Sequence, residues 1–457
     1  MKINHNVTAQ IANVNLKKDE RRVSASLEKL SSGYKITKAA DDSAGLAISN
    51  KMRTQIRALN QASRNSEDGQ SIVQTADGAL NEVAAILQRI RELAVQNAND
   101  TYTVEDRASS QNEIDQLLDE IDRISSTTEF NGKGLLDGSS SRAVTSNIDG
   151  IHALKASAEV PAGDYVFSVN AAPQPAVAED IEYTIPDAGT SCICINNTTI
   201  NIFSDDTDED VENKILDVCG KMDLDVEFSG GSFSLTTKAT GSNQHITVRN
   251  SDNEVEVYMG SDVEIELGDG FSENAKASSN GSHITIKDND GFEMLVEIPA
   301  ETPEGSTEGQ EVTLKVYDAG YMGMQIGGNE NQMLNMNFDE ISCNTLSLRD
   351  ANGQRLINVC SEHGAANAIA SLDLAIERVS AARSELGAYE NRLEDTVSSL
   401  DVASYNMTNS MSRIMDTDMA DEMTQYTQLT VLTQAATSML SQANNKPQEI
   451  MNLLQGI

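Results

Sequence analysis

Apolar residues recur at alternating steps of three and four over long stretches near both ends of the chain. One series comprises Val73, Ala76, Leu80, Val83, Leu87, Ile90 and Ala94. Further series comprise Ile114, Leu117, Ile121 and Ile124, then Leu372, Ile376 and Val379, then Leu386, Leu393, Val397 and Leu400. This spacing predicts helices packed as in coiled coils, with charged residues on their other faces. The stretch 46–98 contains no proline and predicts one uninterrupted helix.

The outermost segments carry narrower apolar stripes. They comprise Val7, Ile11 and Val14, then Val23, Leu27, Leu30 and Tyr34, and at the other end Leu429, Leu432, Ala436, Met439 and Ala443. A narrow stripe on a single helix needs a partner for burial. Two interpretations stay open: the two ends pair within one chain, or they reach full burial only among neighbouring copies. The second interpretation predicts that residues 1–44 and 418–457 become helical only in an assembly.

The middle of the chain, residues 140–319, has a different pattern. Six of the seven prolines lie between positions 161 and 303. Alternating apolar and polar residues predict half-exposed strands at 165–169, 254–258 and 283–287, separated by Gly, Asn and Ser turns. Residues 192–249 predict the order strand, strand, helix, strand, strand. The helix is expected at 208–222, because the acidic run that starts at Asp205 suits a helix N-terminus.

Composition narrows the classes of partner. The net charge is −38, and residues 140–319 contribute 34 acidic and nine basic residues to it. Nucleic acids and anionic membranes are bound mainly through Lys and Arg, so we expect neither as a partner. No apolar run has the length of a membrane span, and the first residues lack the apolar core of a signal peptide. If the chain leaves the cell, we expect it to use neither a cleaved signal of that kind nor a membrane anchor.

The residues that carry chemistry do not form a catalytic pattern. The five histidines are scattered, and no H-E-x-x-H pair, phosphate-binding loop or nucleophile elbow occurs. The five cysteines are Cys192, Cys194, Cys219, Cys343 and Cys360, and we expect them to be small buried apolar side chains without disulfides. The sequence therefore predicts neither an enzyme nor a cofactor or metal site.

Several motifs near the two ends resemble the signatures of bacterial flagellin. The N-terminal motifs are LSSGYKITKAADDSAGLAI at 30–48, QRIRELAVQNAN at 88–99 and TEFNG at 128–132. The C-terminal motifs are QIGGN at 325–329, LGAYENRLE at 386–394, SRIMDTDMA at 412–420 and SMLSQANNKPQ at 438–448. They occur in the order of the family. The segment 193–247 resembles a small repeat found in the outer regions of flagellins.

The resemblance implies a domain organisation. It implies an elongated multidomain α+β protein, mainly α at its paired termini, where a long coiled-coil-like rod forms, with a β-rich outer insertion. Residues 1–44 and 418–457 would be the inner-core terminal helices. Residues 45–139 and 320–417 would form the helical rod domain with a β-hairpin. Residues 140–319 would form an acidic, surface-exposed variable region, which includes a small ββαββ repeat at 190–250.

The resemblance also implies function and partners. Flagellin is secreted and polymerises with itself into the extracellular flagellar filament that serves motility. Its expected partners are the cap and hook-associated proteins, an export chaperone and the host flagellin-sensing Toll-like receptor (Toll-like receptor 5). The implied polymerisation core comprises Val7, Ile11, Leu27, Leu30, Leu429, Leu432 and Met439, and the implied receptor contacts are Arg89, Leu93, Gln96 and Glu113. For Leu93, packing inside the rod stays an alternative, and for Arg89, pairing with a neighbouring Glu.

Two other functions stay open from the sequence. A hook-associated or cap protein of the flagellum would share the end helices but differ in its place in the assembly. A secreted coiled-coil adhesin would be a stable monomer with ordered ends. The motifs at 30–48 and 438–448 favour flagellin over both.

Overall fold

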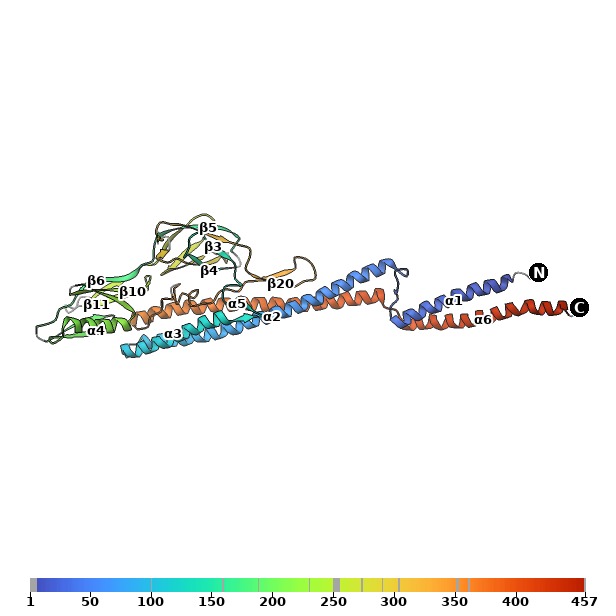
Figure 1. Cartoon of the computed structure of the whole chain (residues 1–457), viewed down its shortest axis with the longest axis horizontal. Helices are drawn as coiled ribbons and strands as arrows, with labels where there is room; N and C mark the ends of the chain where they lie inside the picture. The colour runs from blue at the N-terminus through green and yellow to red at the C-terminus, as the bar shows by residue number, and fades with distance from the viewer. Residues whose placement is uncertain are drawn as a thin grey trace. The chain divides into compact units, whose positions relative to one another are not determined.

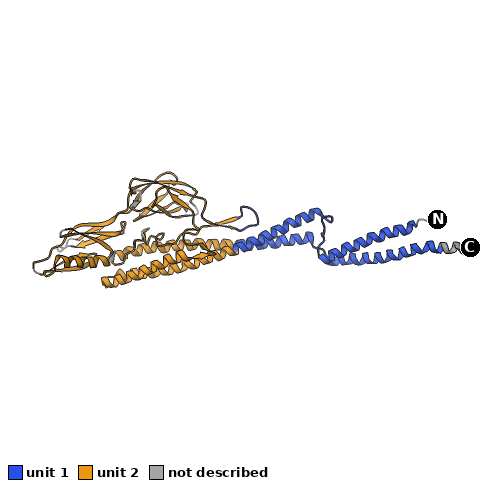
Figure 2. Cartoon of the chain, in the orientation of Figure 1, with its two compact units in different colours: residues 1–66, 325–332, 395–457 blue, residues 67–324, 333–394 orange. Residues whose placement is uncertain are grey.

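The computed structural model describes residues 6–455 except 100, 158–159, 188, 230, 250–254, 273, 290, 303–304, 351–352 and 361. The chain divides into two compact units, which Figure 2 shows in different colours. Unit 1 comprises residues 1–66, 325–332 and 395–457, and unit 2 comprises residues 67–324 and 333–394. Figure 1 labels the helices and strands of the chain.

The helices are long at both ends of the chain and short in its middle. They are α1 (Val7–Ser32), α2 (Ser43–Asn97), α3 (Val104–Thr127), α4 (Asp208–Lys221), α5 (Glu362–Met415) and α6 (Met419–Gln455). The single helix α2 confirms the uninterrupted helix predicted at 46–98. Helix α3 begins with a capping box, in which the side chains of Thr103 and Asp106 each accept from the other's backbone N–H.

Unit 1 contains the pair α1 and α6, the first part of α2 and the last part of α5. Helix α1 is capped by Gly33, directly after Ser32, and the φ of 76° at Gly33 is the left-handed conformation that glycine adopts at low cost. The chain then crosses the break between α5 and α6, where Lys35 donates its N–H to the Met415 carbonyl at 2.6 Å. Within this unit α2 and α5 are antiparallel, since Ser63 bonds Asp401 and Asn60 bonds Ser404.

The rod part of unit 2 consists of the remainder of α2, helix α3 and the first part of α5. The predicted series from Val73 to Ala94 is buried throughout, with no side chain more than 1% exposed. On α3 the prediction needs two corrections, because Leu118 and not Leu117 is fully buried, and Ile124 is likewise only half-buried. The buried positions of α3 follow the series Arg107, Gln111, Ile114, Leu118, Ile121 and Ser125. Because Arg107, Gln111 and Ser125 are polar, the spacing of apolar residues alone does not reveal this series.

The outer part of unit 2 contains two four-stranded sheets that share one core. The first sheet has the order β13-β5-β19-β3, and its strands are β13 (Glu264–Leu267), β5 (Gly163–Ala171), β19 (Glu311–Val316) and β3 (Val144–Ser146). The second has the order β14-β15-β16-β4, and its strands are β14 (Lys276–Asn280), β15 (His283–Lys287), β16 (Glu293–Glu297) and β4 (His152–Ala156). Phe167, Ile284 and Leu314 belong to the common core. Strands β5 and β15 confirm the strands predicted at 165–169 and 283–287.

A second core lies around α4. Two sheets contribute to it, and their orders are β12-β11-β7-β8 and β6-β10-β9. The strands are β6 (Pro175–Glu182), β7 (Thr190–Ile195), β8 (Thr198–Phe203), β9 (Leu224–Ser229), β10 (Ser232–Thr240), β11 (His245–Arg249) and β12 (Val255–Met259). Helix α4 confirms the helix expected at 208–222, and Thr207 caps it. The predicted ββαββ order lacks one strand, because the stretch that follows α4 forms β9, β10 and β11 before residue 250.

Three two-stranded sheets complete the described strands. They are formed by β1 (Glu129–Phe130) with β2 (Lys133–Gly134), β17 (Glu301–Thr302) with β18 (Gly305–Ser306), and β20 (Met322–Gln325) with β21 (Met333–Met336). Strand β12 was predicted at 254–258. It is found at Val255–Met259, and residue 254 lies outside the described residues.

Candidate assembly and recognition surfaces

The terminal helices α1 and α6 pack side by side and antiparallel in unit 1 (Figure 1). Near one end of the pair, the Asn6 side chain donates to the Ala443 carbonyl at 2.9 Å. Near the other end, Lys29 Nζ lies 3.9 Å from a Glu422 carboxylate oxygen. The pairing of the two ends within one chain, one of the two interpretations of the sequence, is therefore present in the structure.

The seam of this pair mixes large apolar side chains with small and polar ones. Its buried and half-buried positions are Ala9, Ala12, Leu16, Asp19, Val23, Ser26 and Leu30 on α1, and Glu422, Tyr426, Leu429, Thr433, Ala436, Leu440 and Ala443 on α6. They follow steps of three and four, as in a coiled coil. Four of them carry a hydroxyl or carboxylate on an aliphatic stem, and the buried Ser26 hydroxyl has no hydrogen-bond partner. Small and polar residues in a seam contribute little apolar burial.

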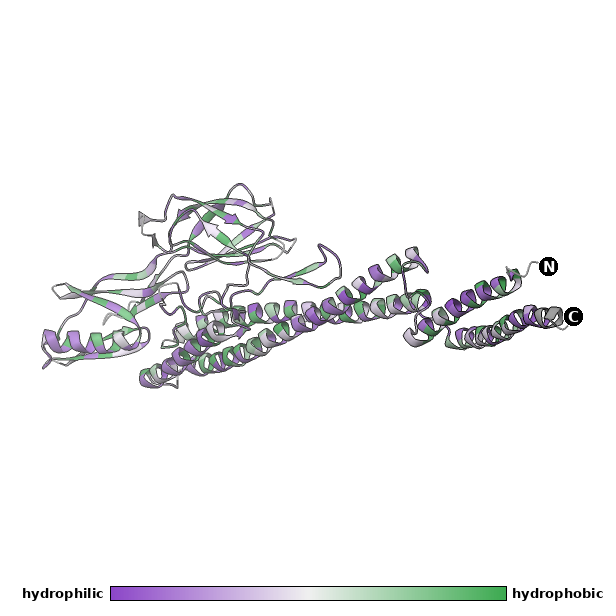
Figure 3. Ribbon diagram, turned by 45° about the vertical axis from the view of Figure 1, so that its right-hand side comes forward, coloured by the Kyte–Doolittle hydropathy of each residue, from purple (hydrophilic) through white to green (hydrophobic). Residues whose placement is uncertain are grey.

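Most of the predicted polymerisation residues lie outside this seam. Val7, Ile11, Leu27, Leu432 and Met439 have exposed fractions between 45% and 67%. Leu30 and Leu429 are instead half-buried within the seam. Figure 3 shows hydrophobic and hydrophilic segments alternating along both terminal helices. Each terminal helix thus has two sets of apolar positions, one covered by its partner helix and one uncovered in the single chain.

The sequence interpretation merged these two sets into one stripe. The signal that separates them is the three-four series of small residues, Ala9 and Ala12 on α1 with Ala436 and Ala443 on α6. An alanine series allows close approach of two helices but has a weak apolar signal. The larger exposed residues beside it therefore dominated the pattern.

The predicted receptor residues lie in unit 2, on α2 and α3. Arg89 donates to Glu113 across the two helices, with 2.9 Å between Nη2 and Oε1, and its other ion-pair partner is Glu92 at 3.4 Å. This pairing raises the pKa of the Arg89 guanidinium above its usual value. Gln96 is exposed and donates to the Tyr102 hydroxyl at 3.0 Å. Arg89, Gln96 and Glu113 are accessible in the single chain.

Leu93 is an exception and needs a correction. Its side chain is 3% exposed, because it packs in the rod core with the series that runs from Val73 to Ala94. It therefore offers no apolar contact to a partner in this structure. The alternative interpretation, packing inside the rod, describes its position.

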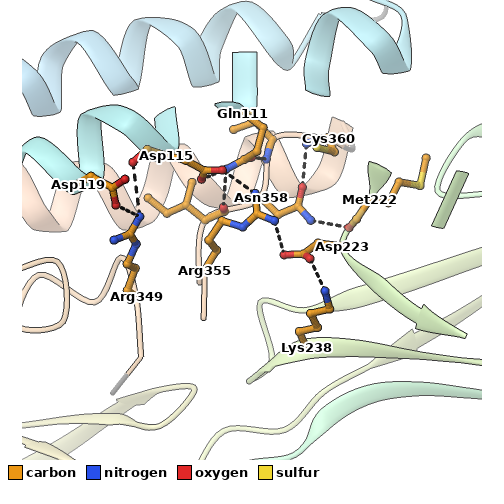
Figure 4. Close-up of polar contacts among 12 residues, drawn as sticks. Gln111, Asp115, Asp119, Met222, Asp223, Lys238, Arg349, Arg355, Asn358 and Cys360 are labelled. Atoms are coloured by element: carbon orange, nitrogen blue, oxygen red, sulfur yellow. Dashed lines mark hydrogen bonds and ion pairs between the residues drawn. The ribbon is translucent and has the colours of Figure 1, made fainter. Parts of the chain in front are cut away.

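A polar network joins α3 to the outer region within unit 2 (Figure 4). Arg355 forms ion pairs with Asp115 at 2.9 Å and with Asp223 at 2.7 Å, and Lys238 pairs with the same Asp223 at 2.8 Å. Arg349 reaches Asp119 at 2.7 Å and Asp122 at 3.2 Å. The network holds Arg349 and Arg355 against α3. Its ion pairs attach the outer region to α3 within unit 2.

Side-chain amides extend the same joint. Gln111 on α3 accepts from the Val359 N–H at 2.8 Å, and Asn358 donates to the Met222 carbonyl at 2.8 Å, directly after α4. The sequence interpretation missed this joint altogether. Apart from Lys238 and Asp223, its paired members are separated by more than 100 positions in the chain, and each of them alone resembles an ordinary surface residue.

The cysteines do not share one environment. Cys219, Cys343 and Cys360 are buried, as expected, and burial raises the pKa of the Cys219 thiol to about 12 and that of Cys360 to about 11. The expected burial is wrong for Cys192, which is exposed, and only partly right for Cys194. Both lie on the outer face of β7, whose opposite face contributes Ile193 and Ile195 to the core.

Within the described ranges, no group of three or more His, Cys, Asp or Glu side chains is placed to hold a metal ion. None of the helices, over the part of the chain that is described, combines the length and apolar character needed to cross a membrane.

Comparison with known proteins gives a consistent result. Residues 3–141 match the family model of the bacterial flagellin N-terminal helical region, and residues 369–454 match that of the C-terminal helical region. The flagellin of Clostridium tyrobutyricum is 36% identical over 452 residues, which cover 98% of this chain and all of the relative. The flagellin of Bacillus subtilis is 32% identical over 459 residues, with both chains covered in full.

Among solved structures, the chain resembles the flagellar hook associated protein-3 of Legionella pneumophila at 13% identity. The match covers 80% of this chain and 98% of that protein, with a TM-score of 0.32. That score is too low to bear on function, whereas the full-length similarity to flagellins covers the rod, the outer region and both terminal helices. The chain belongs to the bacterial flagellin family.

Proposed function

We propose that copies of this chain polymerise by burying the exposed apolar residues of α1 and α6 against one another. Family membership makes the chain a structural protein of the flagellum, outside the cell. One observation carries the proposal for how it assembles. Large apolar side chains of the terminal pair, such as Val7, Ile11 and Met439, are exposed, while eight of the fourteen covered positions in the seam between α1 and α6 hold small or polar residues.

Apolar burial explains why such an arrangement drives assembly. Full burial of one large aliphatic side chain stabilises by about 1.5–3 kcal/mol, and each copy offers several such side chains. The weak seam makes the α1 and α6 pair dependent on further partners. This dependence supports the expectation that residues 1–44 and 418–457 are the inner core, and that 45–139 and 320–417 form the rod. Residues 140–319, with their excess of acidic residues, would then keep filaments apart by charge repulsion.

The test replaces Leu432, which is exposed in the single chain, with aspartate. Purified Leu432→Asp protein should fail to form filaments after seeding or salting-out, because a charge in a seam that becomes buried costs several kcal/mol. The matched control is Gln434→Asp, which adds the same charge two residues away on another face of α6. It should assemble. Electron microscopy and sedimentation report filament formation, and far-UV circular dichroism checks the monomer's fold. Normal filaments from Leu432→Asp would contradict the proposal.

Further flagellar partners follow from the same exposed surface. We expect an export chaperone to cover the apolar residues of α6 before assembly. We expect the cap and hook-associated proteins to contact the terminal helices at the two ends of the filament. If so, the Leu432→Asp variant should also lose affinity for such a chaperone, while Gln434→Asp should keep it.

A second proposal concerns host recognition. We propose that the flagellin-sensing Toll-like receptor contacts Arg89, Gln96 and Glu113, three exposed residues on α2 and α3. Exposed ion pairs such as Arg89–Glu113 stabilise a fold only slightly, so both groups are free to exchange partners at low cost. Packing of adjacent rods in a filament would cover this surface, so we expect only the monomer to bind.

Arg89→Ala tests this contact. Receptor affinity of the monomer should fall more than tenfold, a loss above 1.4 kcal/mol. Arg123→Ala is a matched control, since Arg123 is also exposed on a helix and pairs with Glu120 at a spacing of three residues. The control should bind like the unaltered chain. Equal affinities for all three proteins would remove the assignment.

A further inference from the structure

A cavity of about 410 Å³ lies in unit 2 between the sheet β14-β15-β16-β4 and helix α5. Figure 1 shows β4 on the side of the outer region that faces α5. The lining of the cavity carries a net positive charge, opposite in sign to the net charge of the chain. Four cationic side chains line it, Lys155, Lys276, Lys287 and Arg378, against the two carboxylates of Glu293 and Glu377. In a chain with a net charge of −38, this is a local concentration of positive charge.

Two of the four cations already have carboxylate partners. Lys155 pairs with Glu293 at 3.3 Å and with Asp339 at 3.1 Å. Lys287 pairs with the other oxygen of Glu293 at 3.2 Å. These contacts neutralise one side of the cavity.

Arg378 and Lys276 differ from that pair. Arg378 donates from Nη1 to the Thr345 carbonyl at 2.7 Å and to the Ser347 hydroxyl at 3.0 Å, and from Nη2 to the Thr285 hydroxyl at 3.2 Å. All three acceptors are neutral. Among the residues that the structure describes, no carboxylate oxygen lies within 4.0 Å of a side-chain nitrogen of Arg378 or Lys276.

The Arg378 guanidinium has N–H donors that these hydrogen bonds do not use. It has five N–H donors, and the three hydrogen bonds leave two of them for another acceptor. Burial lowers the pKa of Arg378 below its usual value, and the charge of the Glu293 carboxylate offsets only part of this effect. A bound anion would offset this cost, and the planar fork of arginine matches the oxygens of phosphate and carboxylate groups.

We infer that the cavity is a binding site for a small phosphate-type oxyanion held by Arg378 and Lys276. The uncharged side chains of Ser278, Asn280 and Ser371 also line it and can donate further hydrogen bonds. The volume lies within the range of about 300–1,000 Å³ that is typical of small-molecule sites. Because Lys276 belongs to β14 and Arg378 to α5, a bound anion contacts both the sheet and the rod helix. Its binding strengthens the attachment of the outer region to the rod within unit 2.

The test measures binding of inorganic phosphate to the monomeric full chain by titration calorimetry at constant ionic strength, with chloride as the background anion. Thermal shifts do not suffice, because phosphate stabilises folded proteins by exclusion from their surface without binding. We expect saturable binding of one phosphate per chain. Arg378→Gln should weaken it at least tenfold.

Two further variants keep the result interpretable. Lys276 is exposed, so Lys276→Gln leaves the fold intact, and it should weaken binding about threefold or more. Arg383→Gln is the matched control, because Arg383 lies on the same helix, does not line the cavity and pairs with Asp77 at 2.8 Å. It should bind like the unaltered chain. Absence of saturable binding, unchanged affinity in Lys276→Gln, or an equal loss in Arg383→Gln would overturn the inference.

Discussion

The rod seam and the terminal seam use the same three-four spacing but bury different side chains. In the rod, Leu80, Leu87 and Ile90 are at most 1% exposed. In the terminal pair, the covered positions include Ala9, Ser26 and Thr433, while Val7, Ile11 and Met439 remain exposed. The rod therefore satisfies its apolar residues within one chain, and the terminal pair does not. Spacing alone indicates that a helix has a partner, and the size of the residues at each position indicates whether one partner is enough.

The polar contacts also differ between the rod seam and the terminal seam. Between α2 and α5, ion pairs such as Arg383–Asp77 at 2.8 Å and Arg91–Asp373 at 2.6 Å flank the buried rod seam. Between α1 and α6, the ion pair Lys29–Glu422 is longer, at 3.9 Å. The terminal pair has both a weaker apolar seam and weaker polar contacts, which suits an interface that is completed by other copies.

The largest expected effect comes from replacing one leucine in each region with alanine. Leu87→Ala should destabilise the monomer by about 2–5 kcal/mol, because it leaves a cavity in a closed core. Leu432→Ala should change monomer stability by less than about 0.5 kcal/mol, since the side chain is already exposed. Urea unfolding followed by circular dichroism measures both. Similar losses from the two changes would show that the terminal helices are as closed as the rod.

A smaller effect is expected within the terminal seam itself. Ser26→Ala should stabilise α1 by about 1 kcal/mol, because it removes a buried hydroxyl that has no hydrogen-bond partner. Ser24→Ala is the control, since Ser24 is exposed on the same helix and the change brings the same gain in helix propensity. Amide hydrogen exchange along α1 in the monomer measures both. The comparison is contradicted if both variants protect α1 to the same degree.

The smallest expected effect concerns only the reactivity of the cysteine thiols. In the folded monomer at pH 8, Cys192 should react rapidly with a thiol reagent, while Cys219 and Cys360 should react slowly because burial raises their pKa values and limits access. All five thiols should react in denaturant. Fewer than five reactive thiols in denaturant would indicate a disulfide. A fast reaction of Cys219 in the folded chain would show that the core around α4 opens readily.

Local patterns were sufficient to predict much of the fold. The spacing of apolar residues predicted α2 within a few residues, and the acidic run before Asp208 predicted α4. The motifs near both ends predicted the family, which full-length similarity then established. These features depend on residues that are close together in the chain, so a single sequence contains the whole signal.

Tertiary structure decided the features that depend on distant residues. Whether Leu93 is buried or exposed depends on which face of α2 the other rod helices cover. The division of α1 and α6 into a covered and an uncovered set depends on how closely alanines allow the two helices to approach. The network around Arg355 joins Asp115 to Asp223, and the cavity brings Lys276 to Arg378, over separations of about 100 residues. Periodicity determines that a helix has faces, but only packing determines what each face contacts.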